Sequence, residues 1–147
     1  MSKVALFAGS FDPFTKGHKN IVDRALQSIA DKVIVAIGVN YQKKYMFTLE
    51  ERIETIRKIY ENEPRIIVDS YEGLTTDYAK AVGADFLLRG VRSIKDFEFE
   101  RDIAEVNRRL TGIETVLLVT DAELACVSSS VVRELISYNK DVKEFLP

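Results

Sequence analysis

The sequence has one cysteine, Cys126, one histidine, His18, and no tryptophan. A single cysteine cannot form an intramolecular disulfide, which is typical of proteins in a reducing compartment. Structural zinc takes four cysteine or histidine ligands, and many catalytic zinc sites take several histidines, so the sequence excludes both kinds of site. Any mechanism that needs an imidazole must use His18, which confines the search for such chemistry to one region of the chain.

Long apolar runs and an excess of basic charge are also missing. The longest apolar stretch, residues 33–39, is far shorter than the roughly 20 residues of a membrane-spanning helix. The first residues show neither a signal-peptide core nor a cleavage site. With 21 Lys and Arg against 23 Asp and Glu, the net charge of −2 provides no global field to hold a nucleic acid. We therefore expect a soluble cytoplasmic protein that binds neither membranes nor nucleic acids.

The chain is long enough for one domain and too short for two. Its 147 residues are 46% hydrophobic and 30% charged, with only 7 Gly and 3 Pro, which disfavours disorder. Short apolar runs at residues 4–8, 33–39, 65–69, 86–88 and 115–119 alternate with segments whose apolar residues recur at helical spacing. This alternation predicts an α/β fold over residues 1–147, a doubly wound parallel sheet of five strands with helices on both faces. In such sheets ligands bind beyond the carboxyl ends of the strands.

The first candidate site follows the first predicted strand. Residues 9–18 contain two glycines, Ser10 and His18, at a strand end and a helix start, where free backbone N–H groups favour an anion. The segment matches neither the Walker motif nor the dinucleotide-binding Gly-x-Gly-x-x-Gly pattern. A structural role for His18 in the first helical turn is the alternative. For Asp12 we expect mainly a structural role, as a turn residue that accepts from the backbone that follows it.

Two further segments carry groups suited to phosphates. Arg89 and Arg92 flank Gly90 at the end of the fourth predicted strand, where we expect Gly90 to let the chain turn without a side chain blocking the pocket. The planar guanidinium groups could bind phosphate oxygens or form surface ion pairs. Glu100 could accept from ribose hydroxyls or an amine, or pair with an arginine. Three serines at residues 128–130 could bind an anion, although an ordinary helix N-cap needs only one. Lys43 and Lys44 form a basic loop that is either solvated or brought to the pocket by the sheet.

In order and spacing, these segments are similar to the nucleotidylyltransferase superfamily. The similarity runs through residues 9–18, 43–52, 89–100 and 128–130, and so covers nearly the whole chain. Thr15 stands where many members carry a histidine, which favours the branch that adenylylates 4'-phosphopantetheine over the nicotinate-mononucleotide and glycerol-phosphate branches. The resemblance implies a Rossmann-like nucleotidyltransferase fold. It also implies reversible transfer of AMP from ATP to 4'-phosphopantetheine, giving dephospho-coenzyme A and pyrophosphate, a step of bacterial coenzyme A synthesis.

The resemblance also implies a role for each residue of the site. His18 would stabilise the transition state, and Ser10, Lys43 and Arg89 would hold the phosphopantetheine phosphate, with Leu74 and Thr75 beside the pantetheine arm. The residues implied to bind ATP are Ser10, Phe11, Gly17, His18, Gly90, Val91, Arg92, Glu100, Leu124, Ala125, Cys126, Val127, Ser128, Ser129 and Ser130. Mg²⁺ would enter with ATP and be held by phosphates and water rather than by protein ligands. A homohexamer and inhibition by coenzyme A are further implications.

Two other functions remain open from the residues alone. One is a non-catalytic module that binds adenine nucleotides with the same loops. The other is a flavin-binding electron-transfer protein of similar architecture, which is disfavoured because the first loop is not rich in Ser and Thr and the chain has no tryptophan.

Overall fold

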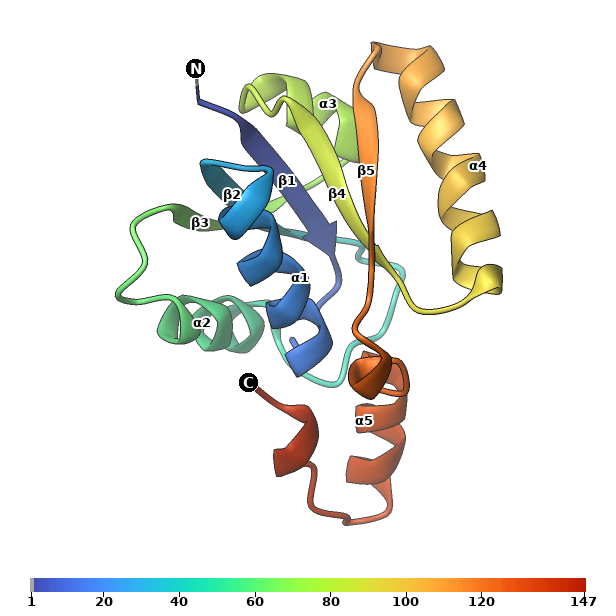
Figure 1. Cartoon of the computed structure of the whole chain (residues 1–147). Helices are drawn as coiled ribbons and strands as arrows, with labels where there is room; N and C mark the ends of the chain where they lie inside the picture. Colours follow the sequence, from blue (N-terminus) through green and yellow to red (C-terminus); the bar gives the residue numbers. More distant parts are fainter. Residues whose placement is uncertain (1) are drawn as a thin grey trace.

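The computed structural model describes residues 2–147, in which five strands form one parallel sheet (Figure 1). The strand order is β3-β2-β1-β4-β5, so the chain begins at the centre of the sheet and extends it first to one side and then to the other. The strands are β1 (Val4–Gly9), β2 (Lys32–Gly38), β3 (Ile66–Tyr71), β4 (Phe86–Val91) and β5 (Glu114–Val119). This order is that of nucleotide-binding Rossmann sheets, and the predicted fold class is confirmed.

Helices cover both faces of the sheet. The chain forms α1 (Lys16–Ser28), α2 (Leu49–Ile59), α3 (Thr75–Ala81), α4 (Ile94–Thr111) and α5 (Ser129–Ser137), with short 3₁₀ turns at Ala122–Leu124 and Lys143–Phe145. On one face, apolar residues of α1 and α2 form a core with alternate residues of the strands. On the other, Ala79 of α3 packs with the intervening strand residues. Alternation along each strand thus builds two cores, as expected for a sheet covered on both sides.

Local sequence signals explain where these helices begin. Thr48 and Glu51 stand at capping-box spacing and form that box at the start of α2, in which each side chain accepts from the other residue's backbone N–H. The Ser128 side chain accepts from the Val131 backbone N–H and so caps α5, which is the ordinary N-cap role that one serine of the run can fill. The α5 helix lies beyond the carboxyl ends of the strands, with the C-terminal segment turning back beside it (Figure 1).

The fourth strand is longer than the sequence predicts. β4 continues past Leu88 to Val91, and Gly90 pairs with Leu118 of β5 within the sheet. We expected Gly90 to permit a turn, and this expectation is wrong. A Cβ at this position would lie 2.9 Å from Ile21 Cγ1, so the glycine instead allows α1 to pack closely against β4.

Helix α4 leaves much of its apolar surface uncovered. Phe99 is 64% exposed, Val106 55% and Leu110 60%, and Ile103 is also exposed. The helix contacts β4, β5 and α3. Within residues 2–147, none of the helices has the length and apolar character that crossing a membrane requires.

Candidate active site

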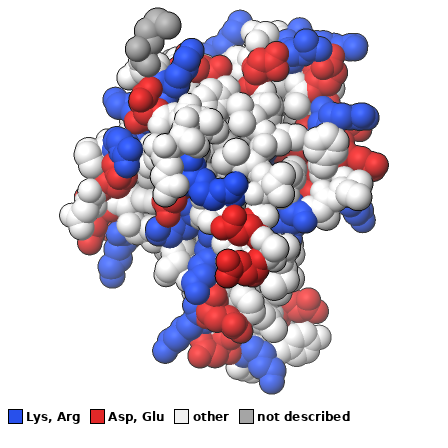
Figure 2. All heavy atoms as spheres, viewed as in Figure 1, with Lys and Arg blue, Asp and Glu red and all other residues white. Residues whose placement is uncertain are grey.

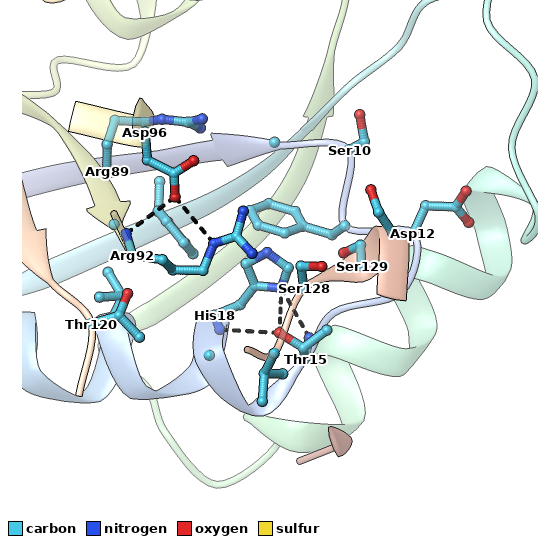
Figure 3. Close-up of a pocket in the computed structure, with 18 of the residues that line it drawn as sticks. Ser10, Asp12, Thr15, His18, Arg89, Arg92, Asp96, Thr120, Ser128 and Ser129 are labelled. Carbon is cyan, nitrogen blue, oxygen red and sulfur yellow. Dashed lines mark hydrogen bonds and ion pairs between the residues drawn. The ribbon is translucent and has the colours of Figure 1, made fainter. Parts of the chain in front are cut away.

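The loops at the carboxyl edge of the sheet enclose a cavity of about 390 Å³ (Figure 3). It is lined from β1 and the loop after it, from α1, from β4 and α4, and from the start of α5. These elements are far apart in the sequence and meet because parallel strands end at the same edge. The predicted residues that line it are Ser10, Phe11, Gly17, His18, Lys43, Arg89, Gly90, Arg92, Glu100, Val127, Ser128, Ser129 and Ser130.

His18 is anchored at the beginning of α1 by Thr15. The Thr15 backbone N–H donates to His18 Nδ1 at 2.9 Å, and the Thr15 side chain accepts from the His18 backbone N–H in return. Because Nδ1 accepts a hydrogen bond, the neutral ring carries its hydrogen on Nε2. The imidazole therefore has one donor, Nε2–H, that is not committed to this cap.

The environment of His18 keeps the imidazole neutral. The ring lies among the rings of Phe7, Phe11 and Phe14, with centroid distances of 6.1, 5.0 and 5.3 Å. Burial lowers the pKa of His18 to about 3, and the positive charges of Arg89 and Arg92 act in the same direction. At neutral pH this side chain is a hydrogen-bond donor rather than a charged group.

Asp12 joins two loops of the site. Its carboxylate accepts from the backbone N–H groups of Met46 and Phe47, both at 2.9 Å. We expected a structural Asp12 that accepts from the residues directly after it; the role is structural, but the partners lie 34 and 35 residues away. Buried Arg52 adds a second link by donating to the backbone oxygen of Ser10. The segment that carries Lys43 is thereby tied to the first loop.

Basic side chains converge on the cavity. Lys43 Nζ lies 3.3 Å from Ser10 Oγ, so the basic loop does reach the pocket. Arg89 pairs with the buried carboxylate of Glu100 at 2.7 Å, and Arg92 pairs with Asp96 at 3.2 Å. Ion pairs were the alternative to phosphate binding for these two arginines; the pairs exist, and both arginines also line the cavity. Glu100 orients Arg89.

The positive charge of the cavity is a local feature: the chain as a whole carries a net charge of −2. Figure 2 shows acidic and basic side chains scattered over one face, around a broad uncharged area. Arg133 adds a further cation, since it lines the cavity and donates from Nη1 to the backbone oxygen of Asp12 at 2.8 Å. An anion entering here meets several cations and neutral donors together.

A second cavity of about 520 Å³ adjoins the first. The two share the wall formed by Ser10, Lys43, Arg89 and Glu100, together with the end of β1. Leu74 and Thr75 line only the second cavity, with residues of β3 and α4. The site therefore consists of two chambers that meet at a wall bearing a lysine and an arginine.

Four of the predicted ATP-binding residues lie outside both cavities. Val91 is buried in β4, and Leu124, Ala125 and Cys126 precede the cavity-lining Val127. Their contact with ATP stays a prediction. The predicted site residues do not include Thr15, Asp96 and Thr120, which also line the first cavity. Thr15 could have been found from its spacing to His18, which is that of a helix cap, whereas Thr120 gives no signal in the sequence.

Sequence comparison places the chain in a family. The cytidylyltransferase-like family model matches residues 6–135, so the chain belongs to this class of nucleotidyl-transferring proteins. A solved structure, the bifunctional NMN adenylyltransferase/ADP ribose pyrophosphatase of Francisella tularensis complexed with AMP and a manganese ion, shares the fold with a TM-score of 0.73 and 16% identity. The chain is 99% covered in that match and spans 44% of the larger protein.

Closer relatives define the branch. The phosphopantetheine adenylyltransferase of Bacteroides fragilis is 54% identical over 97% of this chain and 95% of the relative. The phosphopantetheine adenylyltransferase of Porphyromonas gingivalis is 55% identical over 98% of this chain and 94% of the relative. The chain belongs to the phosphopantetheine adenylyltransferase family, as its sequence motifs suggested.

Proposed function

We propose that the protein transfers AMP from ATP to the phosphate of 4'-phosphopantetheine, forming dephospho-coenzyme A and pyrophosphate in coenzyme A synthesis. Beside the family membership, the observation that carries this proposal is the pair of cavities with a shared basic wall. ATP would occupy the first and phosphopantetheine the second. The acceptor phosphate and the α-phosphate of ATP would then meet at Ser10, Lys43 and Arg89.

In this reaction the acceptor phosphate is itself the nucleophile. One of its oxygens forms a bond to the α-phosphorus of ATP while the bond from that phosphorus to the β-bridging oxygen breaks, and pyrophosphate leaves with the electron pair. The protein supplies no covalent nucleophile. Its task is to hold two polyanions in line and to stabilise charge on the α-phosphoryl oxygens. This suits a site with several cations and one histidine.

His18 acts as a neutral hydrogen-bond donor in this scheme. Its Nδ1 is occupied by the Thr15 N–H, so the ring has no free lone pair with which to take a proton and offers Nε2–H to a phosphoryl oxygen. Glu100 holds the Arg89 guanidinium, and Asp12 holds the loop that carries Lys43. We expect these carboxylates to act by positioning the cations.

Mg²⁺ would enter with ATP. Among the described residues, no three His, Cys, Asp or Glu side chains gather to hold a metal ion. Asp12, Asp96 and Glu100 of the first cavity are each engaged with backbone N–H groups or arginines. This donor set fits an ion held mainly by phosphate oxygens and water, as Mg²⁺ commonly is. When bound, the ion would neutralise charge on the leaving pyrophosphate.

We also propose that the protein works as a homohexamer in the cytoplasm. The exposed apolar residues of α4, Phe99, Ile103, Val106 and Leu110, support association of copies, because such patches usually mark interfaces. Since the last three also line the second cavity, this interface would border the phosphopantetheine site. Coenzyme A carries the same pantetheine arm as the substrate and would inhibit by competing for the second cavity.

An acceptor-dependent pyrophosphate assay tests the function. ATP and 4'-phosphopantetheine together should release pyrophosphate, whereas either alone should not. Nicotinate mononucleotide and glycerol phosphate serve as control acceptors, and turnover with one of these instead would assign the chain to another branch. A protein that binds ATP without releasing pyrophosphate with any acceptor would be a non-catalytic module.

A further inference from the structure

Two hydroxyl groups in contact line the second cavity. The Tyr71 hydroxyl lies 2.7 Å from Thr75 Oγ1, and both residues are part of the cavity wall. Tyr71 ends β3 and Thr75 begins α3, so the contact closes the turn between them. Thr75 is a predicted contact of the pantetheine arm, whereas Tyr71 is not among the predicted site residues.

The position of the Tyr71 hydroxyl is set from two sides. Its ring stacks on Tyr78, with centroids 4.7 Å apart and planes 15° from parallel. On the other side it meets Gly38, where a Cβ would lie 3.0 Å from the Tyr71 hydroxyl oxygen. The ring stack and the missing side chain together hold the phenol against Thr75.

The pair has a defined hydrogen-bonding capacity. One hydroxyl donates to the other, and the acceptor keeps its own hydrogen for a third group. Whichever way the shared bond runs, one O–H donor remains at the wall of the cavity. If Tyr71 donates, the free hydrogen belongs to Thr75, whose side chain is then fixed with its hydrogen away from Tyr71. The two amide carbonyls of a pantetheine arm are suitable acceptors.

We propose that Tyr71 is a positioning residue that orients the Thr75 hydroxyl to donate to an amide carbonyl of the acceptor's arm. The inference rests on the proposed function. It deepens that function by assigning recognition of the arm to a pair of side chains that line the second cavity and not the first. Tyr71 acts through Thr75, so its hydroxyl matters only while Thr75 has one.

Steady-state kinetics with purified full-length protein test this. Tyr71→Phe keeps the ring stack and removes the hydroxyl; we expect the KM for 4'-phosphopantetheine to rise about two- to tenfold, as for one lost hydrogen bond, with the KM for ATP unchanged. Tyr71→Phe should add nothing in a Thr75→Val background, but should retain its effect in a Thr75→Ser background. The matched control is Tyr78→Phe, which removes a hydroxyl of the same stack that donates to Asp69 instead. It should shift neither KM by more than twofold.

Several results would overturn the inference. An unchanged phosphopantetheine KM in Tyr71→Phe is one, and an equal rise in the KM for ATP is another. An undiminished effect in the Thr75→Val background would show that Tyr71 does not act through Thr75. Failure of the proposed function looks different, because the parent protein itself would then release no pyrophosphate with phosphopantetheine.

Discussion

Replacing His18 with alanine should lower kcat by at least about 10² to 10³, the usual cost of removing one preorganised donor to a developing oxyanion. The structure supports this magnitude because Thr15 fixes the ring in the tautomer that leaves Nε2–H free. The side chain of Thr15 also caps α1 at the His18 backbone N–H, which alanine keeps, so the variant should fold. Pyrophosphate release at saturating ATP and phosphopantetheine measures the effect, and KM values should change by no more than a few fold.

The pH dependence separates a neutral donor from a general base. Because the pKa of His18 is lowered to about 3, the free enzyme does not titrate this residue between pH 5 and 8. The profile of kcat/KM against pH should therefore have the same shape in the parent and in His18→Ala. Near-normal turnover in the variant would refute the reasoning, and so would an inflection near pH 6 to 7 that only the parent shows.

The same pKa has a consequence for stability. The unfolded chain takes up a proton on His18 below its ordinary pKa of 6.5, whereas the folded chain does not until about pH 3. Folding is thus penalised as the pH falls through this window, by at most about 1.4 kcal/mol per pH unit and by less here, because His18 keeps some exposure to solvent. Denaturant unfolding should show the parent losing stability relative to His18→Ala between pH 6.5 and 4.5; parallel curves would contradict the burial argument.

Four other substitutions test the remaining parts of the site. Lys43→Ala should weaken phosphopantetheine about tenfold and ATP little, as measured by calorimetric titration; the opposite order would reverse the assignment of the two cavities. Arg89→Ala should also weaken phosphopantetheine. It should lower the free energy of unfolding by about 1 to 3 kcal/mol, less than for a fully buried ion pair, because buried Glu100 loses its partner but the Arg89 side chain is 41% exposed; adding Glu100→Gln should restore part of that stability. Asp12→Asn should lower the free energy of unfolding by about 1 to 3 kcal/mol and raise the phosphopantetheine KM, because an amide cannot accept equally from the backbone N–H groups of Met46 and Phe47. Unchanged values of both would mean that the first loop and the loop that carries Lys43 do not need this link. Val106→Glu should dissociate the proposed hexamer in light scattering, while an unaltered mass would exclude this side of α4 as an interface.

Much of the fold could be predicted from the sequence because the determining signals are local. Thr48 and Glu51 mark the start of α2, and apolar runs mark the centre of each strand. Strand ends were less predictable, since Arg89 and Gly90 do not look like strand residues and belong to β4 only through pairing with β5. The role of Gly90 likewise depends on Ile21, a residue far away in the chain.

For the site, likewise, the location could be predicted from the sequence but the contacts of its residues could not. His18 could be predicted because it is the one histidine of the sequence. The cavity could be predicted from three strand-to-helix segments, those that contain His18, Arg89 and the serine run, because parallel strands bring their carboxyl ends to the same edge of the sheet. The partners of these residues were not predictable in this way. Asp12 was expected to bond its own neighbours and instead accepts from Met46 and Phe47.

The sequence by itself thus determined the class of fold, the edge at which the site lies and the one imidazole available to it, because each follows from composition or from spacing along the chain. Only the tertiary structure decided that Glu100 pairs with Arg89, that the Thr15 N–H occupies one nitrogen of His18 and that Tyr71 meets Thr75. Hydrogen bonds and ion pairs depend on distances of a few ångströms, which packing sets. The net charge of −2 likewise gave no sign of a cationic cavity, because the chain gathers its lysine and arginines there only on folding.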